Sequence, residues 1–170
     1  ERIVGFTDIF SRHWLAGMRA KLGLVRAEEG DEALVKTLLD MMQSSRADFT
    51  LTFRRLCDAA DETGEARLRG MFIDLAAFDQ WAEQWRARAS REALPPEDRA
   101  ATMRRANPAY IPRNHRVEHA LQRAVKHGDL SAFDELFMVL QNPYDDQPAF
   151  AHYADPPGDD FTGYRTFCGT

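Results

Sequence analysis

Residues 71–91 read MFIDLAAFDQWAEQWRARASR, and their apolar side chains decide the fold class. Leu75, Phe78 and Trp85 recur at helical spacing, which places them on one face of an α-helix. Met71 extends that face at the start, and arginines gather at the end, where cations interact favourably with a helix dipole. The stretch therefore predicts one amphipathic helix with an aromatic face.

The same periodicity runs outward from this stretch through most of the chain. No segment alternates with period two for long enough to predict a strand. The sequence therefore predicts an all-α fold of about seven helices in an irregular, orthogonal or bundle-like array. The other predicted helices run from Phe6 to Gly23, from Asp31 as cap through Met42, from Asp48 as cap through Cys57, from Pro96 to Ala106, from Asn114 as cap to Gly128, and from Asp129 or Ser131 to Asn142.

The chain changes character at Asn142. Residues 142–170 hold four prolines, which argue against regular structure, and six aromatic residues, which a solvated linker would lack. We therefore expect residues 1–141 to form a helical domain. We expect residues 142–170 to form an irregular strap, packed on the helices or on a domain outside this chain.

Composition limits the classes of function. The 27 acidic and 22 basic residues give a net charge of −5, whereas nucleic-acid-binding modules are normally basic. No run of about 18 apolar residues is present, so we expect no membrane span. Two cysteines in 170 residues indicate a reducing compartment, and we expect a cytoplasmic protein. Because the chain starts at Glu1 without an initiator methionine or leader, we interpret it as a piece of something longer.

One local pattern could hold a metal ion. Residues 115–119 read HRVEH and match H-x-x-E-H, in which His115 and His119 share a helix face and Glu118 could act as a base beside zinc. A third ligand would have to come from elsewhere, and Glu135 on the next predicted helix is the candidate. Short patterns recur by chance, and Glu118 near a helix start suits the dipole. We therefore favour a structural role and assign no metal ligand.

Aromatic and basic clusters also have structural explanations. Phe78, Trp81 and Trp85 are core by their spacing, with an aromatic ligand cage as the alternative. A basic run consists of Arg86, Arg88, Arg91, Arg99, Arg104 and Arg105. We interpret it as a solvated face balanced by acidic neighbours, with a patch that binds phosphate or a partner as the alternative.

Glycine-rich phosphate-binding signatures are absent from the sequence.

The two cysteines lie in different settings. Cys57 follows Phe53 by four residues on an apolar helix face, which is typical of a small buried residue. Cys168 is third from the end of the sequence, in an irregular segment that can expose a thiol. On this basis alone, Cys168 could be either a terminal thiol without a function or a redox-active thiol.

Residues 107–120 read NPAYIPRNHRVEHA and resemble the N-P-x-Y-I-x-R-N-x-x-x-E-x-A stretch of the selenoprotein O family. The chain ends C-G-T, where that family has cysteine or selenocysteine followed by two small residues. The resemblance covers essentially the whole chain, because shorter stretches agree in the same order. They are MRAKLGL at 18–24, ADFTLTFR at 47–54, NPY at 142–144 and YADPP at 153–157.

This resemblance implies a kinase-like protein adenylyltransferase, which moves AMP from ATP onto hydroxyl groups of Ser, Thr or Tyr in proteins. It implies that the ATP-binding lysine, the acidic residues that bind magnesium and the base lie in a kinase-like part before residue 1. We therefore expect no catalytic and no cofactor-binding residue in this chain. ATP and Mg²⁺ are expected for the full-length parent.

The resemblance also assigns a role to Cys168. In bacterial relatives the near-terminal cysteine is implicated in a disulfide with a cysteine of the kinase-like activation segment, and Cys168 occupies its position. Its partner would lie upstream, because Cys57 is not in the matching place. The ending C-G-T differs from the common C-S-S, which removes a hydroxyl at position 169 but leaves the sulfur chemistry intact.

The resemblance thus predicts the C-terminal helical portion of a bacterial, cytoplasmic enzyme. Its partners would be the upstream kinase-like domain of the same chain and the protein substrates of the parent, with no nucleic acid and no membrane. The alternative is a stand-alone helical interaction module that presents the arginine-rich face or an apolar groove. The coding sequence upstream of Glu1 discriminates between the two.

Overall fold

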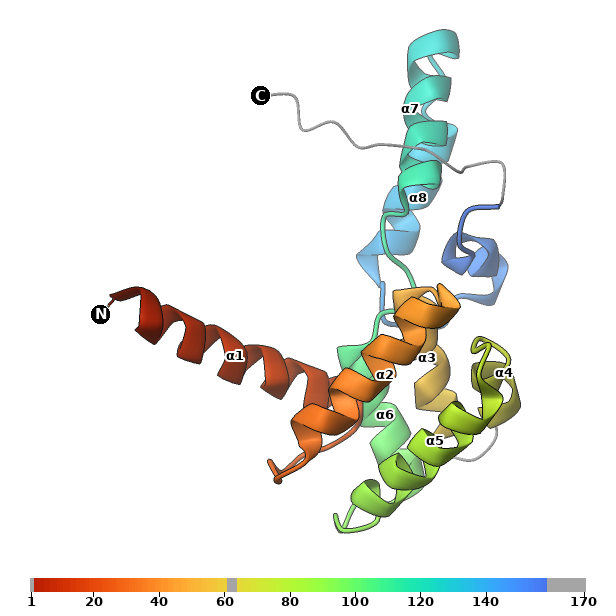
Figure 1. Cartoon of the computed structure of the whole chain (residues 1–170). Coiled ribbons are helices and arrows are strands. Elements are labelled where there is room, and N and C mark those ends of the chain that lie inside the picture. The colour runs from red at the N-terminus through yellow and green to blue at the C-terminus, as the bar shows by residue number, and fades with distance from the viewer. Residues whose placement is uncertain (1, 61–63, 159–170) are drawn as a thin grey trace. The chain divides into compact units, whose positions relative to one another are not determined.

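The computed structural model describes residues 2–60 and 64–158, and this part of the chain is helical without any strand (Figure 1). The chain divides into two compact units, Glu1–Ala109 and Tyr110–Thr170. The all-α prediction is confirmed. The first unit contains α1 (Arg2–Lys21), α2 (Asp31–Ser45), α3 (Phe49–Ala59), α4 (Glu65–Arg69), α5 (Leu75–Ala89) and α6 (Pro96–Ala106), and the second contains α7 (Asn114–His127), α8 (Ser131–Gln141) and the 3₁₀-helix η1 (Pro148–Ala154).

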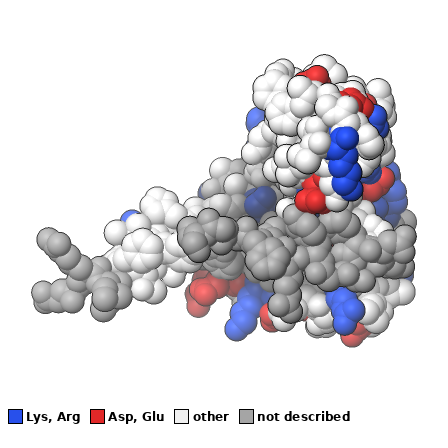
Figure 2. Space-filling model, turned by 90° about the horizontal axis from the view of Figure 1, so that it is seen from above, with Lys and Arg blue, Asp and Glu red and all other residues white. Residues whose placement is uncertain are grey.

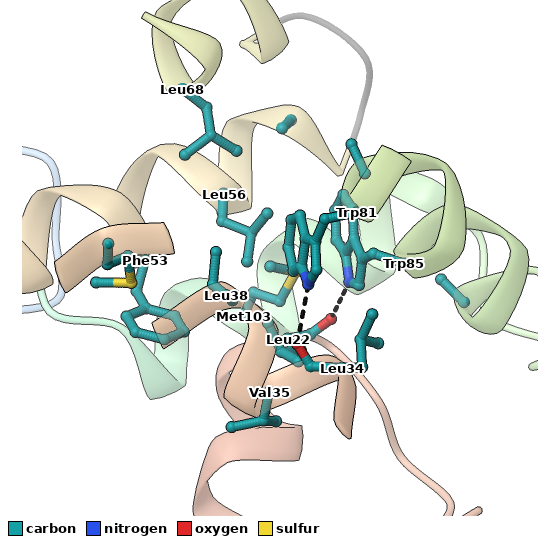
Figure 3. Packing of buried hydrophobic residues seen from close by; sticks show 14 of the residues in the cluster. Leu22, Leu34, Val35, Leu38, Phe53, Leu56, Leu68, Trp81, Trp85 and Met103 are labelled. Carbon is teal, nitrogen blue, oxygen red and sulfur yellow. Dashed lines mark hydrogen bonds between the residues drawn. The ribbon is translucent and has the colours of Figure 1, made fainter. Parts of the chain in front are cut away.

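The core of the first unit forms around the aromatic face of α5. Phe78, Trp81 and Trp85 are almost completely buried among apolar side chains of the neighbouring helices. Trp81 Nε1 donates to the Leu34 carbonyl at 2.9 Å and Trp85 Nε1 to the Leu22 carbonyl at 3.0 Å (Figure 3). Each indole is therefore both buried and hydrogen-bonded. The three rings belong to the core, as predicted.

Only the last turns of α1 join this core. Met18 is buried, whereas Phe6 is 68% exposed, Ile9 51% and Phe10 58%. Figure 1 shows α1 extending away from the other helices of its unit. The helix has the periodicity that the sequence predicts, but most of its apolar face has no partner among the described residues.

Several predicted helix boundaries are confirmed. The Asp48 carboxylate accepts a hydrogen bond from the Leu51 amide at 2.8 Å and caps α3. Gly23 and Gly128 adopt positive φ values of 69° and 63° directly after helical segments, a conformation that glycine adopts at little cost. Both positions were predicted as helix stops.

Other local predictions are wrong. Asp31 and Asn114 are the first residues of α2 and α7 and do not cap them. Met71 lies in the connection between α4 and α5 rather than in α5, although it still packs on the core. The sequence did not predict α4, because five residues are too few to show a helical period.

In the second unit, α7 and α8 are antiparallel neighbours joined by residues 128–130, and η1 packs against α8 (Figure 1). The expectation that prolines prevent regular structure after Asn142 is wrong for η1, because Pro148 occupies its first turn, where no amide hydrogen is needed. The compact units meet at residues 109 and 110, whereas the change in sequence character falls at residues 141 and 142. Phe161, Tyr164 and Phe167 lie outside the described residues.

Candidate functional site

Asn107, the first residue of the 107–120 stretch, is a fully buried hydrogen-bonding centre where α6 ends. Its Nδ2 donates to the Lys21 carbonyl at 2.9 Å and to Cys57 Sγ at 3.4 Å. Its Oδ1 accepts from Lys21 Nζ at 3.3 Å, and its backbone carbonyl accepts from Arg54 Nη1 at 3.1 Å. One asparagine therefore connects α6 to both α1 and α3.

Burial shifts the pKa values of the two titratable groups beside Asn107. Burial raises the pKa of the Cys57 thiol, although the Asn107 hydrogen bond opposes this. Burial lowers the pKa of Lys21, whose ammonium lies 5.4 Å from the Phe53 ring centroid. Because the thiolate is the reactive form of cysteine, Cys57 is a protonated core residue, as the sequence indicated.

Tyr110 forms the second anchor of the 107–120 stretch. Its hydroxyl donates to the Gln147 carbonyl at 2.9 Å and accepts from the Gln147 amide at 3.1 Å. Its backbone amide donates to the Pro143 carbonyl at 3.1 Å. The stretch at 107–120 and the NPY stretch at 142–144 therefore contact each other directly within the second unit.

A buried ion network holds the end of α5. Arg88 Nε donates to Asp31 Oδ1 at 2.7 Å and its Nη1 donates to Glu92 Oε1 at 3.0 Å. Arg99 Nη1 lies 3.7 Å from Glu92 Oε2 and donates to the Gly23 carbonyl. The sequence interpretation of Arg88 and Arg99 as solvated is wrong, because they are only 4% and 5% exposed. The buried carboxylate of Glu92 is a sequence neighbour of both arginines, whereas Asp31, which binds Arg88, lies 57 positions away and is not marked as its partner by the sequence.

Glu92 fixes the connection between α1 and α2. Its carboxylate accepts from the amides of Val25 and Arg26 at 2.9 to 3.1 Å, besides the contact with Arg88. Burial alone would raise the pKa of Glu92, but the two amides and the Arg88 guanidinium outweigh it and lower that pKa. The network is therefore structural, with every charge close to a partner.

The remaining arginines of the run are nearer to solvent, as predicted. Arg86 pairs with Glu65, Arg91 with Glu28, and Arg104 with Asp58, each at 2.8 Å. Figure 2 shows basic and acidic side chains interspersed among other residues on the face in view. The described residues on that face do not form a patch of one sign such as a phosphate-rich partner would need.

The H-x-x-E-H pattern does not assemble a metal site. Glu118 accepts a hydrogen bond from Gln122, and Glu135 accepts one from the Tyr153 hydroxyl at 2.8 Å. Burial lowers the pKa of His115. Throughout residues 2–60 and 64–158, no group of three or more His, Cys, Asp or Glu side chains is placed to hold a metal ion. The structural interpretation of His115, Glu118 and His119 therefore stays a prediction.

A cavity of about 580 Å³ between α7, α8 and η1 was missed by sequence reasoning. Arg116 Nη2 donates to the His152 carbonyl at 2.6 Å, and its guanidinium lies 5.4 Å from the Tyr153 ring centroid. Burial, together with the hydrogen bond to Glu135, raises the pKa of Tyr153 to about 12. Tyr153 therefore stays a neutral phenol, unsuited to act as a nucleophile. The spacing of Arg116, His119 and Arg123 on one face of α7 is the signal that could have indicated this cavity.

The remaining site prediction, Cys168, lies outside the described residues.

Among the described helices, none combines the length and the apolarity that crossing a bilayer requires.

Comparison with known proteins connects these features to a family. A sequence model described as protein adenylyltransferase SelO matches residues 1–141. A protein of Rhizobium etli (strain CIAT 652) named protein nucleotidyltransferase YdiU is 52% identical over 169 residues, which cover 99% of this chain and 34% of that protein. A protein of the same name from Nitrobacter winogradskyi is also 52% identical, over 99% of this chain and 33% of its own length.

A third protein of this name, from Bradyrhizobium diazoefficiens, is 49% identical to this chain over 165 residues, which cover 97% of this chain and 34% of that protein. The chain thus spans about a third of the length of these curated bacterial relatives. Because the family model covers most of the sequence, the chain belongs to the SelO family of nucleotidyltransferases.

Proposed function

We propose that this chain is the C-terminal helical, non-catalytic part of a SelO-type protein adenylyltransferase. In this proposal a kinase-like part outside residues 1–170 binds ATP and Mg²⁺ and transfers AMP to hydroxyl groups of protein substrates. The share of about one third of each relative's length supports this division of labour. ATP as a co-substrate and only two cysteines both suit the bacterial cytoplasm.

The described residues do not fit ATP with Mg²⁺. A magnesium–nucleotide site needs carboxylates free to face the ion and donors arranged around phosphates. Here the buried carboxylates of Asp31 and Glu92 are paired with Arg88. No acidic cluster suited to a metal ion occurs within residues 2–60 and 64–158. We therefore assign no step of the transfer to these residues.

The exposed apolar face of α1 is the single observation on which we base the proposal that this chain supports the catalytic part. Phe6, Ile9 and Phe10 are each more than half exposed, and Trp14 is 38% exposed. A helix that contacts its own unit only at one end gains little stability from packing, and isolated helices are marginal in water. Covering each such side chain is worth roughly 1 kcal/mol or more. The kinase-like part of the parent is the partner that we propose for this face.

Support of this kind can affect catalysis without any contact with ATP. Phosphoryl and nucleotidyl transfer depend mainly on positioning and on electrostatics at the phosphates. A packed helical wall held by Asn107 and by the Arg88 network would keep the catalytic part in one arrangement. Loss of that wall would then lower turnover without removing a reacting group.

Calorimetry of ATP binding tests this division of labour. Residues 1–170 alone are expected to show no measurable heat of binding with ATP and Mg²⁺, whereas the full-length parent binds. Micromolar affinity of residues 1–170 for ATP would overturn the proposal. Matched injections of AMP and Mg²⁺ alone separate nucleotide binding from dilution and metal effects.

We further propose a redox role for Cys168. A disulfide with a cysteine of the kinase-like part would form as both thiols lose their protons and two electrons pass to an oxidant such as oxidised glutathione. Replacing Cys168 with Ser in the full-length parent is expected to abolish the effect of reductant on activity. The control is Cys57→Ser, because that buried thiol is protected. A response to reductant that persists without Cys168 would contradict the role.

A further inference from the structure

The hairpin of α7 and α8 carries an exposed apolar surface that no described residue covers. Leu121 is 53% exposed and Val125 84% on α7, while Phe133 is 50% and Phe137 56% exposed on α8. The two phenyl rings stack on each other, with centroids 6.3 Å apart. Single exposed apolar residues are ordinary, but a contiguous group of this size marks a surface that another element covers.

These residues share one side of the hairpin, which we call the apolar flank. The helices are antiparallel and joined by three residues, so residues equally distant from the connection lie at the same level. Leu121 is then level with Phe137, and Val125 with Phe133. By helical periodicity the four side chains, with Val117 and Leu140, point to the same side.

The other side of the hairpin is polar and already occupied. Residues of η1 pack there: Tyr153 donates to Glu135, and Arg116 donates to the His152 carbonyl. Leu136 and Val139 are buried within the unit. The hairpin thus has one side covered by residues 148–154 and one apolar flank that no residue of the described part of the chain covers.

The chain itself contains a segment suited to this flank. Residues 159–170 follow η1 closely and contain Phe161, Tyr164 and Phe167, spaced three residues apart. In an extended polyproline-type chain, which Pro156 and Pro157 favour just before them, every third side chain points the same way. Twelve residues reach about 40 Å when extended, and a helix with its side chains is about 10 Å wide. The segment can therefore pass around the hairpin to its apolar flank.

We propose that residues 159–170 bind across the apolar flank of the α7–α8 hairpin, with Phe161, Tyr164 and Phe167 against Leu121, Val125, Phe133 and Phe137. This docking places Cys168 beside the same flank. It does not require that the parent transfers nucleotides, so it stands or fails separately from the proposed function.

Cys168 provides a native reporter, because the other thiol, Cys57, is buried. Single cysteines are introduced in the 170-residue chain at Leu121→Cys, Val125→Cys or Phe137→Cys on the apolar flank. The matched control is Ser131→Cys, which is exposed at the polar side of the same hairpin. Oxidised glutathione supplies the oxidant, and each disulfide formed converts it to two reduced molecules. The intramolecular disulfide is quantified by mass spectrometry.

At least one flank cysteine is expected to form the intramolecular disulfide with Cys168 roughly tenfold faster than the control, because docking raises the effective concentration of the two thiols. Replacing both Phe161 and Phe167 with Ala is expected to return that rate to the control level. Hydrogen exchange in α7 and α8 should also quicken when the chain is shortened to end at Gly158.

Three outcomes would overturn the docking. They are equal rates at the flank and control positions, disulfides formed only between two copies of the chain, and unchanged hydrogen exchange in both helices after shortening. The second outcome would assign the flank to self-association. The third outcome would indicate that the rest of the parent covers the apolar flank.

Discussion

α5 and α7 each carry apolar side chains at helical spacing, but the surroundings of these side chains differ. On α5, Phe78, Trp81 and Trp85 are no more than 2% exposed. On α7, Leu121 and Val125 are more than half exposed, and among the residues of that helix only Ala120 is buried. The comparison teaches that periodicity predicts which face of a helix is apolar, whereas the partner of that face is decided by other parts of the molecule.

We expect the largest difference in the free energy of unfolding between a substitution in the core and one on the exposed part of α1. Trp81→Ala removes a fully buried ring and the hydrogen bond from its indole to the Leu34 carbonyl, which should lower the free energy of unfolding by about 3 to 5 kcal/mol. Phe6→Ala, on the exposed part of α1, should change it by no more than about 0.5 kcal/mol. Urea denaturation followed by circular dichroism measures both. Similar losses in the two variants would contradict the assignment of the core.

The next effect compares buried and exposed arginines. Arg88→Met leaves Asp31 and Glu92 buried without their main cation and should cost about 3 kcal/mol or more. Arg91→Met breaks the pair of an exposed arginine with Glu28 and an exposed bond to the Ala87 carbonyl, and should cost less than about 1 kcal/mol. If equilibrium unfolding shows that the two variants are equally stable, the buried network does not hold the end of α5.

The same network predicts a dependence on pH. The pKa of Glu92 is lower in the folded chain than its ordinary value of 4.5. Its carboxylate therefore contributes stability above that value, and the contribution is lost as the pH falls below it and the folded carboxylate becomes protonated. Unfolding titrations from pH 7 to pH 3 should show a smaller loss of stability in Glu92→Gln than in the unmodified chain.

A smaller effect is expected at Asn107. Asn107→Ala removes the acceptor for Lys21 Nζ and the donor to the Lys21 carbonyl, so at least one buried polar group loses its partner, at about 2 kcal/mol. Asn114→Ala is the matched control, since Asn114 is exposed and lies within the first turn of α7. Thermal unfolding that ranks the control as the less stable variant would contradict the role of Asn107.

We expect the smallest change in the free energy of unfolding from a substitution at Tyr153. Tyr153→Phe should cost about 1 kcal/mol through the lost hydrogen bond to Glu135. Because the pKa of Tyr153 is raised from 10.0 to about 12, its stabilising contribution is complete below pH 10 and is lost as the pH rises towards 12. Spectrophotometric titration should show one tyrosine ionising late, and that late step should be absent from the Phe variant.

Local signals were predictable from the sequence, and tertiary partners were not. The Asp48 cap and the Gly23 and Gly128 stops follow from nearby residues alone, and all three are confirmed. The burial of Arg88 is not predictable from its neighbours, because its partner Asp31 lies 57 positions away and nothing local marks the pair. The contacts of Asn107 with Lys21 and Cys57 are not predictable from the local sequence, since they arise from folding. The resemblance of residues 107–120 indicated a family but not this hydrogen-bonding role.

The central claim is that α1 presents a docking face completed by the rest of the parent chain. Hydrogen exchange measured on residues 2–14, in residues 1–170 alone and in the full-length parent, tests it most directly. We predict little protection in the isolated chain and at least roughly hundredfold slower exchange in the parent, because packing rather than propensity stabilises such a helix. Equal exchange of these residues in the two proteins would contradict the claim.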